Sequence, residues 1–328
     1  MSVLDQKNSR RTFAAAALLG TVYAVGMRLL FAGEIQGFEL LTRSFFIGVP
    51  IVTGALTAWL SLNNGQSIWD AIAATTLAIL VFVVTCMLVG LEGLICIVLL
   101  LPILVILPFS GVALVYLGWK FFKRFNRATL PALALLPLLT APIEQYFPID
   151  VEPFTITDRL LIRAPPAQVW SELTNVQIIR RDELQPAVIF AMGVPRPLEA
   201  HMDGKGLGAS RTSRWEKNVV FQERMTRWLP GREMAYDFVI DPQTIPAAAF
   251  DEHVRIGGKN YQLLSGGYRL VEVSPGVTEL TLSTTIANHS RTGLYGKAWS
   301  NFVFDEFHGV ILDLIRDRSE ARTNASEH

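Results

Sequence analysis

Three long runs without a charged side chain dominate the first half of this 328-residue sequence. Ser44 to Trp69, Ala71 to Leu91 and Gly93 to Trp119 contain 26, 21 and 27 residues. A helix needs about 20 apolar residues to cross the hydrocarbon core of a bilayer, so each run predicts one membrane span. The stretch from 71 to 119 is about twice as long as one span, which predicts a tight helical hairpin that reverses near Glu92.

An earlier apolar run, interrupted by Arg28, predicts a fourth span over about residues 12–32. Arg28 is then expected near a headgroup or facing other helices. No small-residue cleavage site follows this run, which favours a retained anchor over a signal peptide. The positive-inside rule places the N-terminus in the cytoplasm because of Lys7, Arg10 and Arg11. After four spans the chain returns to the same side, at a second group of basic residues: Lys120, Lys123, Arg124 and Arg127.

The uncharged run Ala128 to Ile143 decides on which side of the membrane the second half lies. If it crosses, as a fifth span over about 129–147, everything after Pro148 is extracytoplasmic. If it only re-enters or lies at the interface, the second half is cytoplasmic. We favour crossing and expect a multi-pass protein of the inner membrane, with the other spans over about 12–32, 44–62, 70–91 and 93–119. Glu92 and Glu144 fall where runs turn or end, so we interpret both as interfacial residues.

Charge divides the chain into two unlike halves. Residues 1–148 carry nine basic and six acidic side chains, whereas residues 149–328 carry 20 and 23. The second half therefore has the charge density of a soluble domain. The balanced total excludes nucleic-acid binding driven by net positive charge. Cys86 and Cys96 lie in apolar runs, which excludes a disulfide framework and a zinc cluster; no cofactor or metal is predicted.

The second half alternates strand and helix signals after a short linker, 148–153. Alternating apolar residues from Phe154 to Ile162 predict a strand, and Pro165-Pro166 suits the first turn of a helix. Further strands are expected over 210–216, 219–229, 233–241, 267–273 and 278–288, as an antiparallel meander. A long helix, roughly Tyr295 to Ala321, closes the pattern because its apolar residues recur at three and four positions.

Several motifs in this half resemble those of a known superfamily. The sequence Ile-x-Ala-Pro-x-x-x-Val-Trp at 162–170 resembles the opening of the START-like superfamily, also called SRPBCC, which includes polyketide cyclases. Other stretches resemble a bacterial branch of it: Gly193-Val-Pro-x-Pro197, Gly206-x-Gly-Ala-x-Arg211, Glu223 to Trp228 and Gly266-x-Tyr268. The resemblance covers about residues 154–322 and leaves 323–328 as a tail.

The resemblance implies the α+β helix-grip fold, a curved antiparallel sheet around a long C-terminal helix, placed here after an all-α membrane region. Members of this superfamily enclose an apolar cavity that binds lipids, sterols, polyketides or plant hormones, and some catalyse reactions. The last helix and the segment Gln185 to Gly208 are expected to cover that cavity.

Strand pairing predicts which side chains line the cavity. A turn at Lys217-Asn218 would place Arg214 opposite Phe221, and a turn at Pro230-Gly231 would place Met225 opposite Tyr236. The more apolar face is taken as the inner one: Thr212, Arg214, Phe221, Glu223, Met225, Tyr236, Phe238 and Ile240. Arg214 and Glu223 would then be near neighbours that either anchor a ligand head group or form a buried ion pair that shapes the sheet. We favour the ion pair.

The last helix contributes a second group of candidates. Trp299 belongs to its apolar arc, and His308 falls at the rim of that arc. His308 could act as an acid–base group or ligand donor, although a hydrogen-bonded histidine at the edge of a core is the favoured interpretation. The candidate ligand-binding residues are Arg214, Glu223, Tyr236, Phe238, Trp299 and His308.

Three functions remain open at this point. The first is a membrane-anchored START-like protein that binds an apolar small molecule or lipid. The second is a cyclase or hydratase that uses Glu223, Tyr236 or His308 for proton transfer on an apolar substrate. The third is a non-catalytic membrane module whose soluble domain docks a protein partner.

Overall fold

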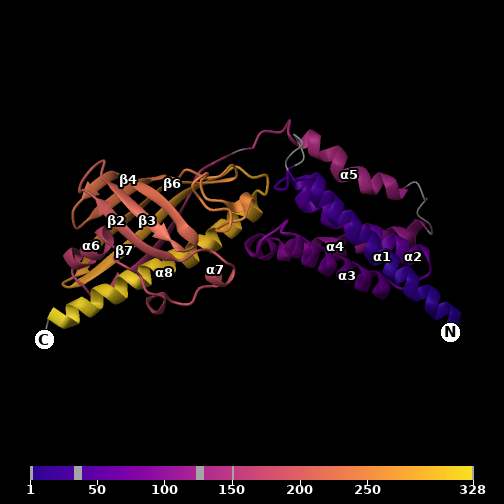
Figure 1. The fold of residues 1–328 in the computed structure, drawn as a ribbon, viewed down its shortest axis with the longest axis horizontal. Coiled ribbons are helices and arrows are strands. Elements are labelled where there is room, and N and C mark those ends of the chain that lie inside the picture. Colours follow the sequence, from indigo (N-terminus) through magenta and orange to yellow (C-terminus); the bar gives the residue numbers. More distant parts are fainter. Residues whose placement is uncertain (1–2, 33–38, 123–128, 150, 327–328) are drawn as a thin grey trace. The chain divides into compact units, whose positions relative to one another are not determined.

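The computed structural model in Figure 1 describes residues 3–32, 39–122, 129–149 and 151–326. Contacts divide the chain into two compact units, Met1–Ile149 and Asp150–His328. The first unit is helical, and the second is built on an antiparallel sheet. Of the basic residues used above to orient the chain, Lys123, Arg124 and Arg127 lie outside the described residues.

The first unit consists of apolar helices. They are α1 (Val3–Leu30), the π-helical turn η1 (Ser44–Gly48), α2 (Val49–Asn63), α3 (Ile68–Val89), α4 (Leu94–Phe122) and α5 (Thr129–Glu144). In the described part of the chain, four helices are long and apolar enough to cross a membrane: Gln6–Leu30, Ser44–Asn63, Ile68–Val89 and Leu94–Phe121. Helix α5 has 16 residues, or about 24 Å, which is shorter than a hydrocarbon core of about 30 Å.

Glycines allow α2 and α4 to pack backbone against backbone. A Cβ atom at Gly54 of α2 would overlap the carbonyl of Pro108 in α4, and one at Gly111 of α4 would overlap the carbonyl of Ile51 in α2. Small residues at such crossings let apolar helices gain dispersion energy at close range. Accordingly, α2 is the most buried of the four long helices.

Local signals set the ends of α3. Ser67 and Asp70 form a capping box, in which each side chain accepts a hydrogen bond from the backbone N–H of the other. Gly90 ends the helix with a φ of 72°, a conformation that glycine adopts without strain. The chain enters α4 at Leu94, so Glu92 lies in the turn between the two helices.

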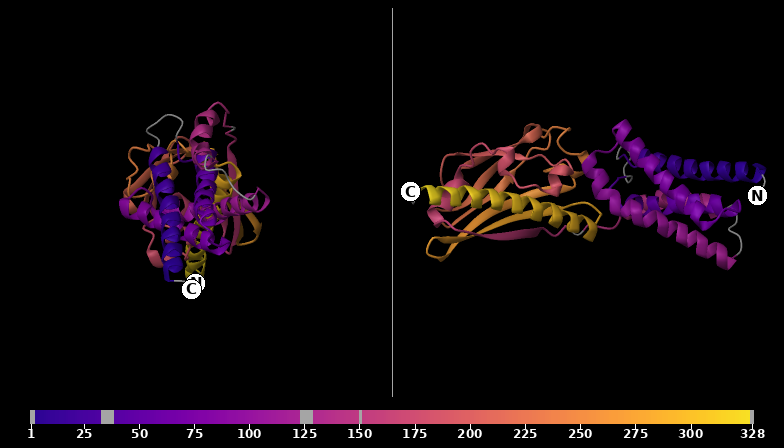
Figure 2. Two further views of the ribbon diagram at one scale, coloured as in Figure 1. Left: turned by 90° about the vertical axis from the view of Figure 1, so that its right-hand side faces the viewer. Right: turned by 90° about the horizontal axis from the view of Figure 1, so that it is seen from below.

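The second unit contains a seven-stranded antiparallel sheet in the order β1-β7-β6-β5-β4-β3-β2, curved around the long helix α8 (Figure 2). The strands are β1 (Phe154–Ile162), β2 (Pro197–Asp203), β3 (Ser210–Trp215), β4 (Val219–Leu229), β5 (Glu233–Val239), β6 (Tyr261–Ser274) and β7 (Val277–Asn288). The helices are α6 (Pro166–Thr174), α7 (Val188–Ala191) and α8 (Leu294–Ser326), with short 3-10 turns over Arg181–Glu183, Glu216–Asn218 and Glu252–Val254. The predicted fold class, a helical region followed by a curved antiparallel sheet around a C-terminal helix, is confirmed.

Both ends of this sheet combine fully buried residues with half-buried aromatic rings. We call the end at which β1 begins (Phe154) the proximal end, and the end at which β1 stops (Ile162) the distal end. The distal inner face, α6 and α8 share a core of fully buried residues, which includes Ile162, Leu173, Leu280 and Ile315. Half-buried rings occur at both ends, Trp170 and Trp228 beside this core and Phe238, Phe304 and Phe307 towards the proximal end, where Ile286, the partner of Phe154, is fully buried.

Two expectations about the strands and their turns are wrong in this unit. The segment 185–208 is not simply a cover, because its second half forms the edge strand β2. The turn between β3 and β4 contains Glu216 in addition to Lys217 and Asn218. One extra residue shifts the β3–β4 register by one, so Ser213 rather than Arg214 lies opposite Phe221, and Arg211 lies opposite Glu223. Such a shift reverses the face of every side chain in the strand.

Candidate functional site

A buried ion pair occupies the middle of the inner face. Arg211 Nε lies 2.5 Å from Oε2 of Glu223, and the two side chains are 3% and 6% exposed. The Ser213 hydroxyl donates to Oε1 of Glu223 at 2.8 Å, and Arg211 Nη1 donates to the Leu173 carbonyl at 2.9 Å. These hydrogen bonds offset the cost of removing both charges from water.

Two tyrosines cover the guanidinium. The Arg211 Cζ atom lies 5.0 Å from the ring centroid of Tyr236 and 5.6 Å from that of Tyr268, within the range of cation–π attraction. The Tyr236 ring lies across Gly266, where a Cβ atom would meet the ring and its hydroxyl. Burial, reinforced by the charge of Glu223, raises the pKa of Tyr236 well above its usual value, so the phenol stays protonated.

His308 of α8 also packs against the inner face of the sheet, and its side chain is completely buried. Its Nδ1 atom is 2.7 Å from Asp158 Oδ2, and its Nε2 atom is 2.8 Å from the Thr284 hydroxyl oxygen. Burial lowers the pKa of His308, although the hydrogen bond to Asp158 opposes this shift. A neutral ring that donates from Nδ1 to the carboxylate and accepts at Nε2 fits this geometry. His308 is therefore a hydrogen-bonded histidine that ties α8 to β1 and β7, in line with the favoured interpretation, although it is fully buried and not at a rim.

The structure brings together only some of the predicted site residues. Glu223 and Tyr236 share the inner-face cluster, and Phe238 packs edge-on against Tyr236 with ring centroids 5.3 Å apart. Trp299 is half-buried in the first turns of α8, where its ring contacts Tyr295 and Phe302.

Arg214 does not belong to the cluster. Its side chain is 60% exposed on the outer face, and its Nε atom lies 3.3 Å from Glu199 Oε1. The longer β3–β4 turn is the cause, since it exchanges the inner and outer faces of β3. Sequence reasoning missed Arg211, Asp158 and Thr284, although Arg211 closes one of the motifs that carry the START-like resemblance.

Aromatic rings continue from this cluster towards the proximal end. Trp215 of β3 stacks on Phe307 of α8 at 4.9 Å, and Phe221 contacts Phe238 at 5.9 Å. Several of these rings are half-buried although they lie between the sheet and the helix. The inner face therefore places half-buried aromatic rings beside a buried polar cluster.

The outer face of the sheet carries an open hollow of about 610 Å³. Hydroxyl groups of Thr155, Thr157, Thr226, Ser265, Thr281, Ser283 and Thr285 line it, together with charged residues such as Arg159, Glu233 and Arg269. Neither Arg211 nor Glu223 belongs to its lining. Alternating hydroxyl and charged side chains are also usual on the solvent face of an antiparallel sheet.

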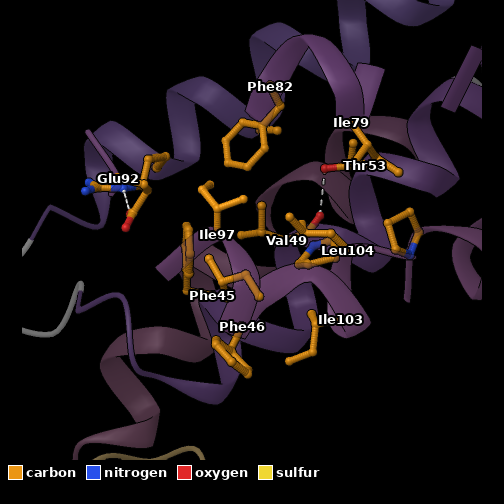
Figure 3. A pocket seen from close by; sticks show the side chains of 15 residues that line it. Phe45, Phe46, Val49, Thr53, Ile79, Phe82, Glu92, Ile97, Ile103 and Leu104 are labelled. Carbon is orange, nitrogen blue, oxygen red and sulfur yellow. Dashed lines mark hydrogen bonds and ion pairs between the residues drawn. The ribbon is translucent and has the colours of Figure 1, made fainter. Parts of the chain in front are cut away.

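The helical unit has a small apolar cavity of about 40 Å³ among α1 to α4 (Figure 3). Phe45, Phe82 and Ile97 line it, and Glu92 lies at its edge. Glu92 Oε1 is 2.5 Å from Arg28 Nε, and both side chains are buried. Glu92 therefore lies in the predicted turn and is ion-paired within the unit.

Glu144 also has a specific role. Its carboxylate accepts hydrogen bonds from the backbone N–H groups of Arg43 and Ser44, at 2.9 and 3.0 Å, and from the Ser44 hydroxyl. It thus caps the start of the helix that leads into α2. For the described residues, no group of three or more His, Cys, Asp or Glu side chains could hold a metal ion.

Comparisons with known proteins find similar solved structures. No protein-family model and no curated protein sequence matches the chain. A Streptomyces aromatase/cyclase is 14% identical, with 53% of this chain and 98% of that chain covered and a TM-score of 0.35. A norcoclaurine synthase mutant from Thalictrum flavum is 11% identical, with 54% and 99% covered and a TM-score of 0.34. A Staphylococcus aureus protein of unknown function is 11% identical, with 54% and 99% covered and a TM-score of 0.37. These likenesses say nothing about ligand or chemistry.

Proposed function

We propose that this protein is anchored in a membrane and binds an apolar small molecule or lipid between the sheet and α8 of its second unit. The observation that carries the proposal is the group of half-buried rings between the sheet and α8, Phe238, Phe304 and Phe307, beside the buried Arg211–Glu223 pair. Phe238 and Phe307 would contact the apolar body of the ligand, and the Arg211–Glu223–Tyr236 cluster would receive its polar group. The four long apolar helices support the anchoring.

Binding is favoured over proton transfer by the state of the candidate groups. The Glu223 carboxylate is held by Arg211 and Ser213, and the raised pKa of Tyr236 makes its hydroxyl a poor acid at neutral pH. Both ring nitrogens of His308 have partners within the fold. We further propose an inner-membrane location with a cytoplasmic N-terminus, in which α5 decides the side of the second unit.

Identification of copurifying molecules tests the function. The full-length protein is extracted in mild detergent, and its bound small molecules are identified by mass spectrometry. Three proteins are compared: wild type, the double variant Arg211→Met/Glu223→Leu, and Arg214→Ala as a control on the outer face. A lipid or isoprenoid present in wild type and in the control but lost from the double variant supports the proposal. Equal retention in all three proteins would contradict the assigned site.

A further inference from the structure

Three side chains from three elements form a hydrogen-bonded series on the inner face of the sheet. Asp158 of β1 lies 2.7 Å from Nδ1 of His308 on α8, and Nε2 of His308 lies 2.8 Å from the hydroxyl oxygen of Thr284 on β7. A carboxylate that orients a histidine, which in turn accepts the proton of a hydroxyl, is the arrangement that activates a hydroxyl as a nucleophile. The contacts that tie α8 to the sheet therefore also have the order that acyl transfer needs.

The protonation state of His308 fits the role of a base. Burial holds the pKa of His308 below its usual value, so the ring is neutral at pH 7 and can take up a proton at Nε2. Asp158 fixes the tautomer, because Nδ1 must carry the proton that it donates to the carboxylate. His308 does not exchange a proton with a ligand directly, since both ring nitrogens are bonded, but it can act on a ligand through the Thr284 hydroxyl.

A hydrogen-bond donor lies beside Thr284. Thr284 pairs directly with Gly266 of β6, and a Cβ atom at Gly266 would be 2.8 Å from the hydroxyl oxygen of Tyr236. Directly paired residues have Cβ atoms about 5 Å apart, so the Tyr236 hydroxyl lies within about 8 Å of the Thr284 Cβ atom. Because burial raises the pKa of Tyr236, the phenol keeps its proton and can donate it in a hydrogen bond to an oxyanion.

Half-buried aromatic rings flank this group. The Phe304 ring contacts His308 with ring centroids 6.1 Å apart, and Phe238 packs edge-on against Tyr236. Thr284 itself is 4% exposed, so a substrate would reach its hydroxyl by displacing these two rings, which are only half-buried. A molecule that places an apolar chain against the rings and a carbonyl carbon at the hydroxyl fits this arrangement.

We propose that Thr284, His308 and Asp158 hydrolyse carboxylic esters with an apolar acyl chain. This rests on the proposed function, because the ester must occupy the space assigned there to the ligand. As the Thr284 oxygen bonds to the carbonyl carbon, its proton passes to His308 Nε2, and Tyr236 donates a hydrogen bond to the oxyanion. The bond to the alcohol oxygen then breaks, and His308 gives the proton to the leaving alcohol. Water cleaves the acyl–Thr284 ester by the same route, which releases the carboxylic acid and restores the hydroxyl.

Turnover of a chromogenic ester tests the hydrolysis. The full-length protein in mild detergent is mixed with para-nitrophenyl octanoate, nitrophenol release is followed, and the acylated residue is located by peptide mass spectrometry. We expect wild type to hydrolyse the ester and to carry the octanoyl group on Thr284. Thr284→Val should lower the rate to that of detergent alone, whereas Thr284→Ser should retain it within about tenfold, because serine supplies the same hydroxyl. Thr285→Val is the matched control, because Thr285 is the next residue of β7 and lines the hollow on the outer face.

Two further variants separate catalysis from a purely structural tie. Tyr236→Phe should lower kcat about 100-fold, as expected for one lost oxyanion donor. Asp158 is a positioning residue, so Asp158→Asn should lower kcat by at least about 100-fold and leave KM unchanged. Unfolding temperatures of the same proteins show whether each variant is folded.

Other results would overturn the hydrolysis. These are a wild-type rate equal to that of detergent alone, an unchanged rate in folded Thr284→Val, or acylation at a residue other than Thr284. Mass spectrometry of copurifying molecules separates the two proposals. A copurifying molecule without turnover removes the hydrolysis alone. Turnover without any molecule copurifying with wild type or with Thr284→Val removes the proposed function alone.

Discussion

Among the residues that the structure describes, each unit buries one Arg–Glu ion pair, and the two pairs have different surroundings. In the helical unit, Arg28 bonds to Glu92 and also donates to the Leu91 carbonyl at 2.7 Å. In the sheet unit, Glu223 accepts hydrogen bonds from the Ser213 hydroxyl and from the guanidinium of Arg211. Two tyrosine rings cover that guanidinium. The first pair joins the end of α1 to a turn between helices, whereas the second lies in the middle of a sheet face.

The difference shows how each unit holds its charges. The residues of the helical pair are 64 positions apart, so that pair exists only when α1 packs beside the α3–α4 turn. The residues of the sheet pair are 12 apart and are placed by the register of a single hairpin. The helical pair therefore depends on tertiary packing, and the sheet pair depends on one turn.

Breaking the sheet pair is expected to have the largest effect. Glu223→Ala leaves the Arg211 charge buried without its partner, which costs about 3–5 kcal/mol of unfolding free energy. Chemical denaturation of the full-length protein, followed by tryptophan fluorescence, measures the loss. Glu199→Ala is the control, because its partner Arg214 is exposed and such pairs contribute only about 0–1 kcal/mol. Similar losses of unfolding free energy from both variants would show that the buried pair contributes no more to stability than the exposed pair.

Backbone packing in the helical unit gives the next largest effect. Gly54→Val forces α2 and α4 apart, since even a Cβ atom would overlap the Pro108 carbonyl. We expect a loss of about 1–3 kcal/mol, measured as a lower unfolding temperature and earlier aggregation in detergent. Gly26→Val is the matched control, because a Cβ atom there meets nothing within 4 Å. If the control loses as much, helix propensity and not close packing explains the result.

Acidification provides a smaller test, specific to the sheet unit. Because burial holds the pKa of His308 below its usual 6.5, the unfolded chain binds a proton more readily than the folded protein. The stabilising contribution of the neutral, buried His308 ring is complete above about pH 6.5 and is lost as the pH falls through the lowered pKa. The unfolding temperature should therefore fall between pH 7 and 5, and fall less steeply in His308→Gln. His201→Gln, which alters an exposed histidine, should keep the wild-type slope; an unchanged slope in His308→Gln would refute this role.

Much of the fold could be predicted from periodicity, but turn length could not. Lys217 and Asn218 have φ values of 57° and 59°, and nothing in the apolar alternation shows that Glu216 joins their turn. By contrast, the predicted pairing of Met225 with Tyr236 is correct because two irregularities cancel. The turn after Leu229 has three residues, and a bulge at Thr226 restores the register.

The candidate site was less predictable than the fold. Glu223, Tyr236 and Phe238 reach the inner face because β4 and β5 alternate as expected. Arg211 replaces Arg214 because of the single extra residue in the turn that follows β3. The pairs Arg28–Glu92 and His308–Asp158 join residues 64 and 150 positions apart. Strand and helix periods do not encode such separations, so these contacts require the folded structure.

Replacing both members of an ion pair should have the smallest effect on stability and separates structural from binding roles. Arg211→Met/Glu223→Leu removes both charges at similar volume, so neither charge remains unpaired, and unfolding free energy should change by less than about 1 kcal/mol. Arg28→Met/Glu92→Leu is the corresponding change in the helical unit. If the sheet pair receives the ligand's polar group, only its removal abolishes ligand copurification. If both double variants retain the ligand, the Arg211–Glu223 pair shapes the sheet and the ligand's polar group is held elsewhere.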